Sequence, residues 1–278
     1  MSVQIIVDST ADLTPSLKEK VLIVPLSVHF GSEEFIDGVT IDHKTFYEKL
    51  VSSDVLPSTS QAAPAGFEEK YEQVRAAGNS AVVITVASKV SGTYQSAVIA
   101  SEGYENIHIV DGGSVAIGSG ILTELALALV EEGLDAPQIV ARLEEAKQKL
   151  RIVAVLDTLE YLKRGGRISK TVAFAGGLLN IKPILGITDG EILMLGKARG
   201  NKQASHMLVE EIEKSGSIDY SRPVLLGYTG LTDELLQNFI AGNKDLFAPL
   251  SELHCSAIGS VIGTHAGPGA FAVAYFCK

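Results

Sequence analysis

The chain has 278 residues, of which 46% are hydrophobic and 20% are charged, and its formal net charge is −10 at pH 7. This composition is typical of a folded globular protein with one large or two medium cores, and the usual sizes of domains favour two. The negative charge argues against nucleic-acid binding through a general basic surface, because such a chain would repel a phosphate backbone.

The first half of the chain alternates apolar runs of strand length with segments of helical periodicity. Strands that are apolar throughout and separated by helices are typical of a parallel sheet covered on both faces. Residues 1–150 are therefore predicted to form an α/β domain with a mostly parallel sheet flanked by helices. We expect strands at 4–7, 21–30, 81–86 and 107–110, and helices after Pro15, Asp42 and Pro64 and over 115–131 and 136–149.

The second half, residues 151–278, has a different pattern. The runs 181–187 and 192–195 are separated by Asp189-Gly190, a turn sequence that tight hairpins prefer. Such a hairpin implies antiparallel pairing, so we predict an α+β domain with a mostly antiparallel sheet. Further strands are expected at 223–228, 252–258 and 270–276, and helices at 200–214 and 231–241.

Targeting signals and cysteine spacing indicate the compartment. The first residues lack a basic n-region and a signal-type cleavage site, and no apolar run reaches the roughly 18–20 residues that span a membrane. Cys255 and Cys277 lie far apart, without the spacing of a zinc site or of a disulfide framework. We therefore expect a cytoplasmic protein with no metal site.

Polar clusters follow several of the predicted strands. Asp8-Ser9-Thr10 is interpreted as a structural turn, because the chain supplies no further aspartates of the kind that hold a metal for phosphoryl transfer. The segment 57–61 is either a loop with capping hydroxyls or a rim rich in hydrogen-bond donors. The sequence does not favour one of these over the other.

Two later clusters could hold a ligand. At Ser91-Gly92-Thr93 a predicted helix begins, and its free N–H groups and partial positive charge suit an anion. The alternative is an ordinary N-cap by Ser91, which needs no ligand. His265 lies among three glycines and a proline, in a backbone suited to close approach, and we favour a functional role there slightly over a structural one.

Basic residues form two short clusters in this acidic chain. Residues 163–167, which contain Arg164 and Arg167, are either a helix C-terminus with a glycine cap or a basic segment that binds an anionic ligand. Residues 197–202 form a second patch, of a kind that is usually only a solvated face. No Walker-type loop or serine elbow is present, and the glycines at 112–120 fit a dinucleotide fingerprint badly.

Eight motifs in this order resemble the DegV family of bacterial fatty-acid-binding proteins, which includes the fatty-acid-binding subunit of fatty acid kinase. The resemblance extends over nearly the whole chain. Two positions depart from the family pattern: Gly112 replaces a usual serine, and Ala272 replaces a frequent glycine, a change expected to alter packing only. The motifs are IVDSTADL at 6–13, VPL at 24–26, TSQ at 59–61, SGTYQSA at 91–97, DTLEYL at 157–162, RGGRI at 164–168, KPIL at 182–185 and HAGPG at 265–269.

The resemblance implies a fold and a site. Residues 151–278 would resemble the substrate domain of dihydroxyacetone kinase, and a long-chain fatty acid would lie between the two domains. The carboxylate would be held by Thr59 and Ser91, with His265 and Arg167 at the same end. For the arginine, Arg164 is the alternative.

The resemblance also implies a role as a carrier without enzymatic activity of its own and without a cofactor. The bound acid would be presented to a separate, ATP-dependent fatty acid kinase of the dihydroxyacetone-kinase-like type, which forms the acyl phosphate. We expect Lys197, Arg199 and Lys202 to dock that kinase. Transient contact with a membrane would deliver or remove the lipid.

Simple energetics fit this hypothesis. Each methylene removed from water contributes about 0.8 kcal/mol, so a tail of roughly sixteen carbons gains about 12 kcal/mol before ordering costs. Burial of the ionised carboxylate costs several kcal/mol unless hydrogen-bond donors compensate it. We expect the apolar lining to come from the segments 115–131 and 171–180.

Two other functions stay open at this point. In an acyl hydrolase, Ser91 would attack, His265 would act as the base, and an acidic residue such as Asp111 would orient the histidine. In a binder of sugars or diol phosphates, the ligand would be small and polar.

Overall fold

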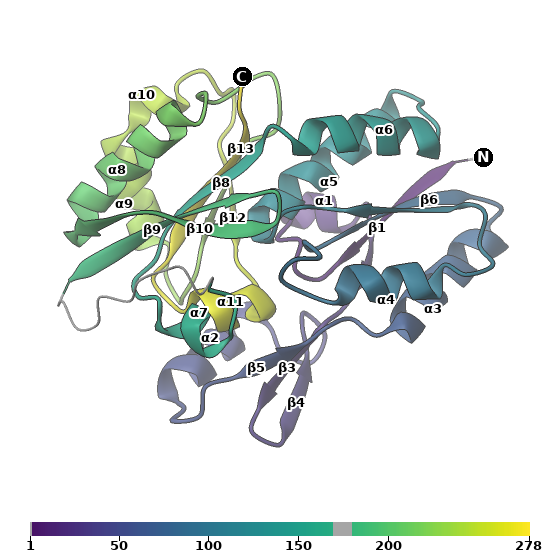
Figure 1. Ribbon diagram of the computed structural model, residues 1–278, viewed down its shortest axis with the longest axis horizontal. Coiled ribbons are helices and arrows are strands. Elements are labelled where there is room, and N and C mark those ends of the chain that lie inside the picture. The colour runs from purple at the N-terminus through teal and green to yellow at the C-terminus, as the bar shows by residue number, and fades with distance from the viewer. Residues whose placement is uncertain (1, 169–179) are drawn as a thin grey trace.

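The computed structural model describes residues 2–168 and 180–278 and contains two large sheets side by side (Figure 1). The first sheet has the order β2-β1-β6-β7, and each of its pairs is parallel. Its strands are apolar on both sides because helices cover both faces, as a parallel sheet requires. The strands are β1 (Val3–Asp8), β2 (Leu22–Val24), β6 (Ser80–Thr85) and β7 (Ile107–Asp111).

Four helices cover this first sheet. On one face α3 (Pro64–Ala76) and α4 (Thr93–Ala100) pack on β2, β6 and β7. On the other face lie α5 (Ala116–Glu131) and α6 (Ala136–Lys147), which appear above the sheet in Figure 1. The expectation of a mostly parallel sheet flanked by helices is therefore confirmed.

The second sheet has the order β10-β9-β8-β13-β11-β12, and only its β11-β12 pair is parallel. The prediction of a mostly antiparallel sheet is confirmed. Helices α8 (Gly200–Lys214), α9 (Glu234–Gly242) and α10 (Lys244–Phe247) cover its outer face (Figure 1). The strands are β8 (Leu150–Val155), β9 (Ile181–Thr188), β10 (Glu191–Arg199), β11 (Leu225–Tyr228), β12 (His254–Ala257) and β13 (Phe271–Phe276).

The predicted hairpin of the second sheet is present. Strands β9 and β10 pair in antiparallel register, and both Asp189 and Gly190 have positive φ, at 50° and 72°. Two consecutive residues with positive φ match the twist of the flanking strands, which explains the preference for Asp-Gly at such a turn.

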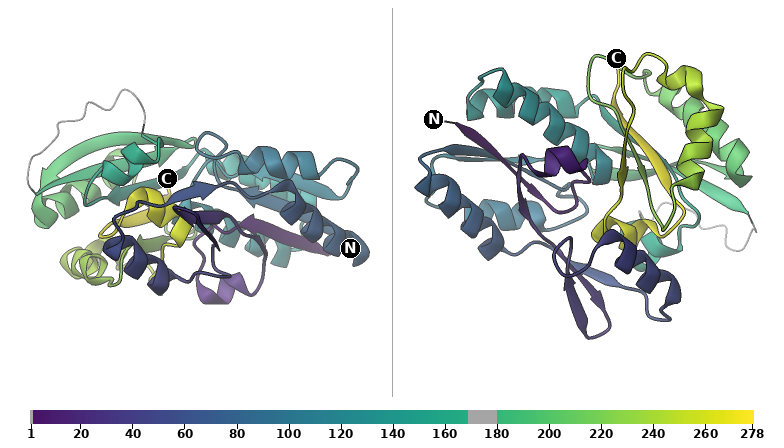
Figure 2. Two further views of the ribbon diagram at one scale, coloured as in Figure 1. Left: turned by 90° about the horizontal axis from the view of Figure 1, so that it is seen from below. Right: turned by 180° about the vertical axis from the view of Figure 1, so that it is seen from behind.

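A third, small sheet was not predicted. Its order is β4-β3-β5, and the β3-β4 hairpin projects away from the large sheets (Figure 2). The run 21–30 was expected to be one strand, and this expectation was wrong. Pro25 divides the run because proline lacks the N–H that would continue the pairing with β1. The parts are β3 (Ser27–Phe30), β4 (Glu33–Ile36) and β5 (Ser58–Ser60).

Four further helices complete the part of the fold that the structure describes. Helix α1 (Pro15–Lys18) is a single turn after the first strand. Helix α2 (His43–Ser52) begins at Asp42, whose side chain accepts a hydrogen bond from the backbone of Thr45. Helix α11 (Ser260–Ala266) packs on α2, on α7 (Glu160–Arg164), and on β3 and β5 of the small sheet. Helix α11 therefore joins the C-terminal part of the chain to the small N-terminal sheet.

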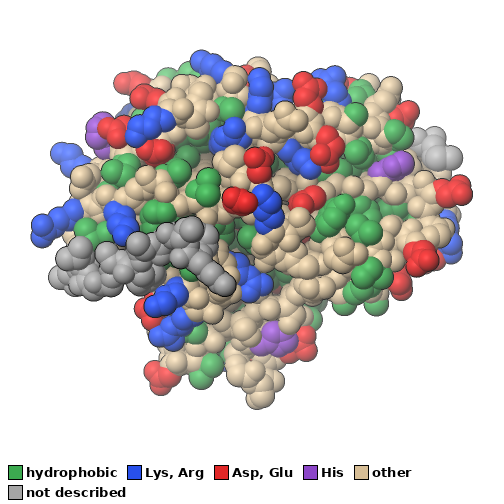
Figure 3. All heavy atoms as spheres, viewed as in Figure 1, with side chains coloured by type: hydrophobic (Ala, Val, Ile, Leu, Met, Phe, Trp, Pro, Cys, Tyr) green, Lys and Arg blue, Asp and Glu red, His purple; other side chains and the backbone are tan. Residues whose placement is uncertain are grey.

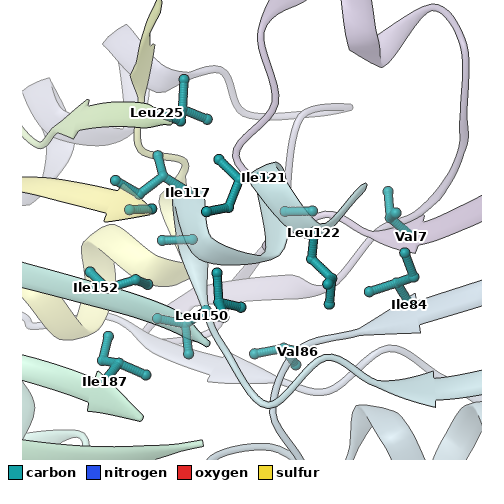
Figure 4. Close-up of a cluster of buried hydrophobic side chains, with 14 of the residues drawn as sticks. Val7, Ile84, Val86, Ile117, Ile121, Leu122, Leu150, Ile152, Ile187 and Leu225 are labelled. Atoms are coloured by element: carbon teal, nitrogen blue, oxygen red, sulfur yellow. The ribbon is translucent and has the colours of Figure 1, made fainter. Parts of the chain in front are cut away.

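Helix α5 lies between the two large sheets and contacts both of them. It is apolar nearly all round, as a helix buried on all sides must be. Figure 4 shows Ile117, Ile121 and Leu122 of α5 between Val7 of the first sheet and Ile152 of the second. Because one apolar cluster joins the sheets, the domain boundary near residue 150 stays a prediction.

Candidate functional site

A cavity of about 400 Å³ lies where the two large sheets, α5 and α11 meet. Its volume is within the range of roughly 300–1,000 Å³ that is usual for small-molecule sites. Most of its wall is apolar and comes from both halves of the chain. The apolar residues include Leu26, Val86, Val90, Val115, Ile117, Ile152, Ala154, Leu156, Leu185, Ile187, Ile258, Ala270 and Ala272.

The expected sources of the lining are only partly correct. Of the segment 115–131, the first turn lines the cavity, through Val115, Ala116 and Ile117. The segment 171–180 lies, except for residue 180, outside the described residues. Ala272 was expected to affect packing alone, but its side chain is part of the cavity wall.

All four residues expected to bind the carboxylate line this cavity. Thr59 comes from β5, Ser91 from the loop before α4, Arg167 from the segment after α7, and His265 from α11. The fold thus gathers side chains that are up to 206 residues apart in the sequence. The alternative arginine, Arg164, instead forms an exposed ion pair with Glu160 on its own helix.

Thr59 and His265 are in direct contact. The Thr59 Oγ1 atom lies 3.0 Å from Nε2 of His265, and the Nδ1 atom of the same ring has no hydrogen-bond partner among the described residues. Burial, assisted by the positive charge of Arg167, lowers the pKa of His265 to about 4. The imidazole is therefore neutral near pH 7, and one of its nitrogens carries the proton.

A glycine makes room for this ring. A side chain at Gly165 would place its Cβ 2.2 Å from the Nδ1 atom of His265. The segment after α7 can therefore approach α11 closely only because residue 165 has no Cβ.

Ser91 is held by the start of α4. Its Oγ atom lies 2.9 Å from the Oγ1 atom of Thr93 and accepts a hydrogen bond of 3.3 Å from the Thr93 backbone N–H. The helix N-cap is Gly92, so the alternative of an ordinary N-cap by Ser91 is not what the structure shows. The Gln61 carboxamide lies against Gly92, where a Cβ would come within 2.0 Å of Oε1.

Arg167 bridges the two halves of the chain at the cavity. Its Nε donates to the carbonyl of Val90 at 3.1 Å, and its Nη1 donates to the carbonyl of Gly165 at 2.7 Å. Within the described part of the chain, these bonds use two of the five N–H groups of the guanidinium. Arg167 also lines an adjoining outer groove, together with Lys89 and Glu191, so it lies between the cavity and the surface.

The catalytic arrangement of the hydrolase alternative is not assembled in the described part of the chain. Asp111 accepts hydrogen bonds from the backbone and hydroxyl of Ser88 and from the backbone of Gly113. The Nδ1 atom of His265, where an orienting carboxylate would bind, has no hydrogen-bond partner in 2–168 and 180–278. No acidic residue of these ranges therefore orients this histidine as a general base would require.

Asp8 has the structural role that the sequence indicated. Its carboxylate accepts hydrogen bonds from the backbone and hydroxyl of Thr10, at 2.9 and 2.6 Å, and from the backbone of Val86 at 2.6 Å. These contacts fix the turn after β1 and tie it to the end of β6.

The sequence did not indicate the burial of two further carboxyl side chains, Asp12 and Asp37. Asp12 accepts from the backbone N–H of Gly259 at 2.8 Å, and Asp37 accepts from the Ser260 hydroxyl at 2.5 Å. Burial raises the pKa of Asp37 and raises that of Asp12 to about 8. Both side chains therefore hold the start of α11, the helix that carries His265.

The residues expected to dock a kinase lie elsewhere. Lys197, Arg199 and Lys202 are exposed at the end of β10 and the start of α8. Basic side chains are visible at the left edge of the molecule, where these elements lie, while both signs of charge mix over the rest of this face (Figure 3). Arg199 and Lys202 line a surface groove of about 860 Å³, whose wall includes Phe271, a residue that also lines the cavity.

Other kinds of site are not found among the described residues. In 2–168 and 180–278, no group of three or more histidine, cysteine, aspartate or glutamate side chains could hold a metal ion. Within the same residues, every helix is too short or too polar to cross a membrane.

The fold and the cavity together define an α/β protein with two large sheets and an internal, mostly apolar cavity, on whose wall Thr59, Ser91, Arg167 and His265 gather. The family model described as "Uncharacterised protein, DegV family" matches residues 2–278, and the chain belongs to this family. The resemblance inferred from the eight motifs is confirmed.

Relatives and solved structures agree with this assignment. A DegV domain-containing protein of Caldanaerobacter subterraneus is 35% identical over 276 residues, which are 98% of this chain and 97% of the relative. A DegV family protein from Thermus thermophilus, described for its fatty-acid binding, has a TM-score of 0.89 and 29% identity and covers 99% of this chain and 100% of its own. A stearic-acid-binding protein from Eubacterium ventriosum has a TM-score of 0.86 and 28% identity and covers 99% and 98%.

Proposed function

We propose that this protein is a carrier that buries the tail of a long-chain fatty acid in the cavity between its sheets and holds the carboxylate with Thr59 and Ser91. The observation that carries this proposal is that two hydroxyls, a neutral imidazole and a guanidinium line a cavity whose wall is otherwise mostly apolar. The fatty-acid binding described for the Thermus thermophilus and Eubacterium ventriosum proteins supports it.

The two ends of such a ligand contribute differently. The tail supplies most of the affinity, at about 0.8 kcal/mol for each buried methylene. The carboxylate opposes binding by several kcal/mol, and hydrogen bonds to a charged group return about 1.5–3 kcal/mol each. Donors at Thr59, Ser91 and Arg167 are enough to offset that cost, so the head group sets orientation and selectivity.

The apolar wall is also the argument against a small polar ligand. A sugar or a diol phosphate would bury many hydroxyl or phosphate oxygens, each of which needs a hydrogen-bond partner. The cavity wall offers Thr10, Thr59, Ser60, Gln61, Ser91, Arg167, Thr229 and His265 against a larger apolar surface. That balance suits one polar head on a long tail.

Mass spectrometry of the ligand released from denatured protein tests the proposal directly. We expect saturated or unsaturated long-chain acids, and we expect the variant with Thr59→Val and Ser91→Ala to release much less of them. Release of a sugar phosphate by the parent protein would contradict the proposal. So would labelling of Ser91 by a serine-directed phosphonate together with turnover of acyl esters.

We further propose that the bound acid is presented to a separate fatty acid kinase, which transfers the γ-phosphoryl group of ATP to the carboxylate and releases ADP. The exposed Lys197, Arg199 and Lys202 would dock that kinase. Their positive charge in a chain of net charge −10 supports this choice. So does Phe271, which lines both the cavity and the groove that Arg199 and Lys202 line.

Replacement of all three basic residues by glutamine tests the docking site. We expect acyl-phosphate formation by added kinase to fall while fatty-acid affinity stays unchanged. Loss of both properties, or of neither, would count against docking at this surface. Binding of the ligand-free protein to lipid vesicles would test the transient membrane contact that delivers the acid.

A further inference from the structure

We propose that Thr93 is a positioning residue, which directs the hydroxyl proton of Ser91 into the cavity. This inference rests on the proposed function, because it concerns how Ser91 meets a carboxylate. Thr93 begins α4, and its side chain is 0% exposed, so it has no contact with solvent.

The hydrogen bonds of Thr93 decide the direction of the proton. Its Oγ1 accepts from the backbone N–H of Ala62 at 3.2 Å and lies 2.9 Å from the Oγ of Ser91. A hydroxyl has one proton to donate and two lone pairs. Among the described residues, the Ser91 Oγ is the one acceptor within reach of the Thr93 proton. Since a buried donor is costly without a partner, Thr93 donates and Ser91 accepts.

Ser91 is then fully used as an acceptor. One lone pair of its Oγ takes the Thr93 hydroxyl proton, and the other takes the Thr93 backbone N–H at 3.3 Å. The proton of Ser91 has no acceptor in this chain of bonds, and Ser91 lines the cavity. The serine therefore offers a donor to whatever lies in the cavity.

This arrangement favours a ligand that only accepts hydrogen bonds. A carboxylate meets that condition and binds a fixed donor more strongly than an ester oxygen does, because its charge strengthens the hydrogen bond. Without the Thr93 hydroxyl, Ser91 can turn its proton elsewhere, so the discrimination between an acid and its ester decreases. Thr93 therefore acts on selectivity through Ser91 and does not itself touch the ligand.

The test compares dissociation constants of a long-chain fatty acid and of its methyl ester in the full-length protein. In Thr93→Val, which keeps the shape but removes the hydroxyl, we expect the preference for the acid to fall about tenfold while affinity for the ester stays within about twofold. In the control Thr93→Ser, which keeps the hydroxyl, the preference stays within about twofold of the parent. Thr93→Cys, a much weaker donor, is expected to lose most of the preference and serves as a second variant if Thr93→Val does not fold.

If Thr93→Val weakened the binding of the acid and of the ester equally, Thr93 would have a merely structural role, and the inference would be overturned. An unchanged preference in Thr93→Val, or in Thr93→Cys, would overturn it as well. The proposed function fails in a different way: the parent protein itself would then show no preference for the acid over the ester.

Discussion

A substitution that narrows the cavity distinguishes the contribution of the ligand's tail to the binding affinity from that of its head group. Ala154 lies on β8, where its register neighbours are Leu185 of β9 and Ala272 of β13, and all three side chains line the cavity. Ala154→Leu adds three carbon atoms to this wall. These atoms occupy the space of about three methylene groups of a bound tail.

The expected cost follows from the lost burial. At about 0.8 kcal/mol for each methylene, three displaced methylenes weaken binding by about 2.4 kcal/mol, which is about 60-fold in the dissociation constant. Acids short enough to end before residue 154 lose nothing. Calorimetric titration with saturated acids of increasing length should therefore show a loss that grows with length and then levels off. The ligand-free variant should be at least as stable as the parent, because the added carbons fill empty space.

Val153→Ile is the matched control, since Val153 is the neighbour of Ala154 on the same strand but packs in the outer apolar cluster with Leu208 of α8. It adds one carbon atom to the same strand on the face away from the cavity, and we expect no dependence on chain length. A loss in Ala154→Leu that is the same for short and long acids would refute the placement of the tail along this wall.

Two further predictions concern the groups around α11. Asp12→Asn should reduce the pH dependence of the unfolding free energy between about pH 4 and 8. Burial raises the pKa of Asp12 to about 8, so in this window the native state keeps a proton that the unfolded chain loses. The unfolding free energy of the parent therefore falls as pH rises through the window. Denaturant unfolding at several pH values measures this slope, and an unchanged slope contradicts the assignment. Gly165→Ala should weaken fatty-acid binding about tenfold, because the added Cβ would push His265 away from Thr59. The control Gly242→Ala has open space around the added Cβ and should bind as the parent does. Equal affinities of the two variants would contradict the role of the Thr59–His265 contact.

The large sheets could be predicted because their strands carry a strong local signal. Val82, Val83 and Ile84 are buried on both faces of a parallel sheet, so the sequence is apolar without interruption. The small sheet has no such signal. Its strand at Ser58–Ser60 has three hydroxyl side chains, and it forms because it pairs with β3 and packs on α11. Tertiary contacts, and not local preference, make this segment a strand.

The candidate site could be predicted only in part for a similar reason. Ser91 and His265 could be identified as candidates because each follows a predicted strand and lies within two residues of a glycine. Nothing in their spacing shows that Thr59 meets His265 across 206 residues. The resemblance to a family placed both residues at the carboxylate end but did not predict their direct contact. Asp12 and Asp37 were missed because aspartate is normally exposed. Asp12 and Asp37 are buried against the N-terminus of α11 because segments distant in the sequence pack together, which local sequence does not reveal.

Asp12 and Asp37 explain how so short a helix can hold His265, a residue proposed to bind the ligand, in place. Helix α11 has 7 residues, and a helix of that length is not stable alone. Asp12 and Asp37 bind the N–H groups of Gly259 and Ser260 at its start, which lack partners inside the helix. The same helix contacts α2, α7 and the small sheet, so its position is fixed from several sides. His265, near its end, is thus carried by the C-terminal part of the chain but anchored to the N-terminal part, and Thr59 contacts it from there. A change that releases the start of α11 should therefore weaken carboxylate binding even though it touches no residue of the cavity.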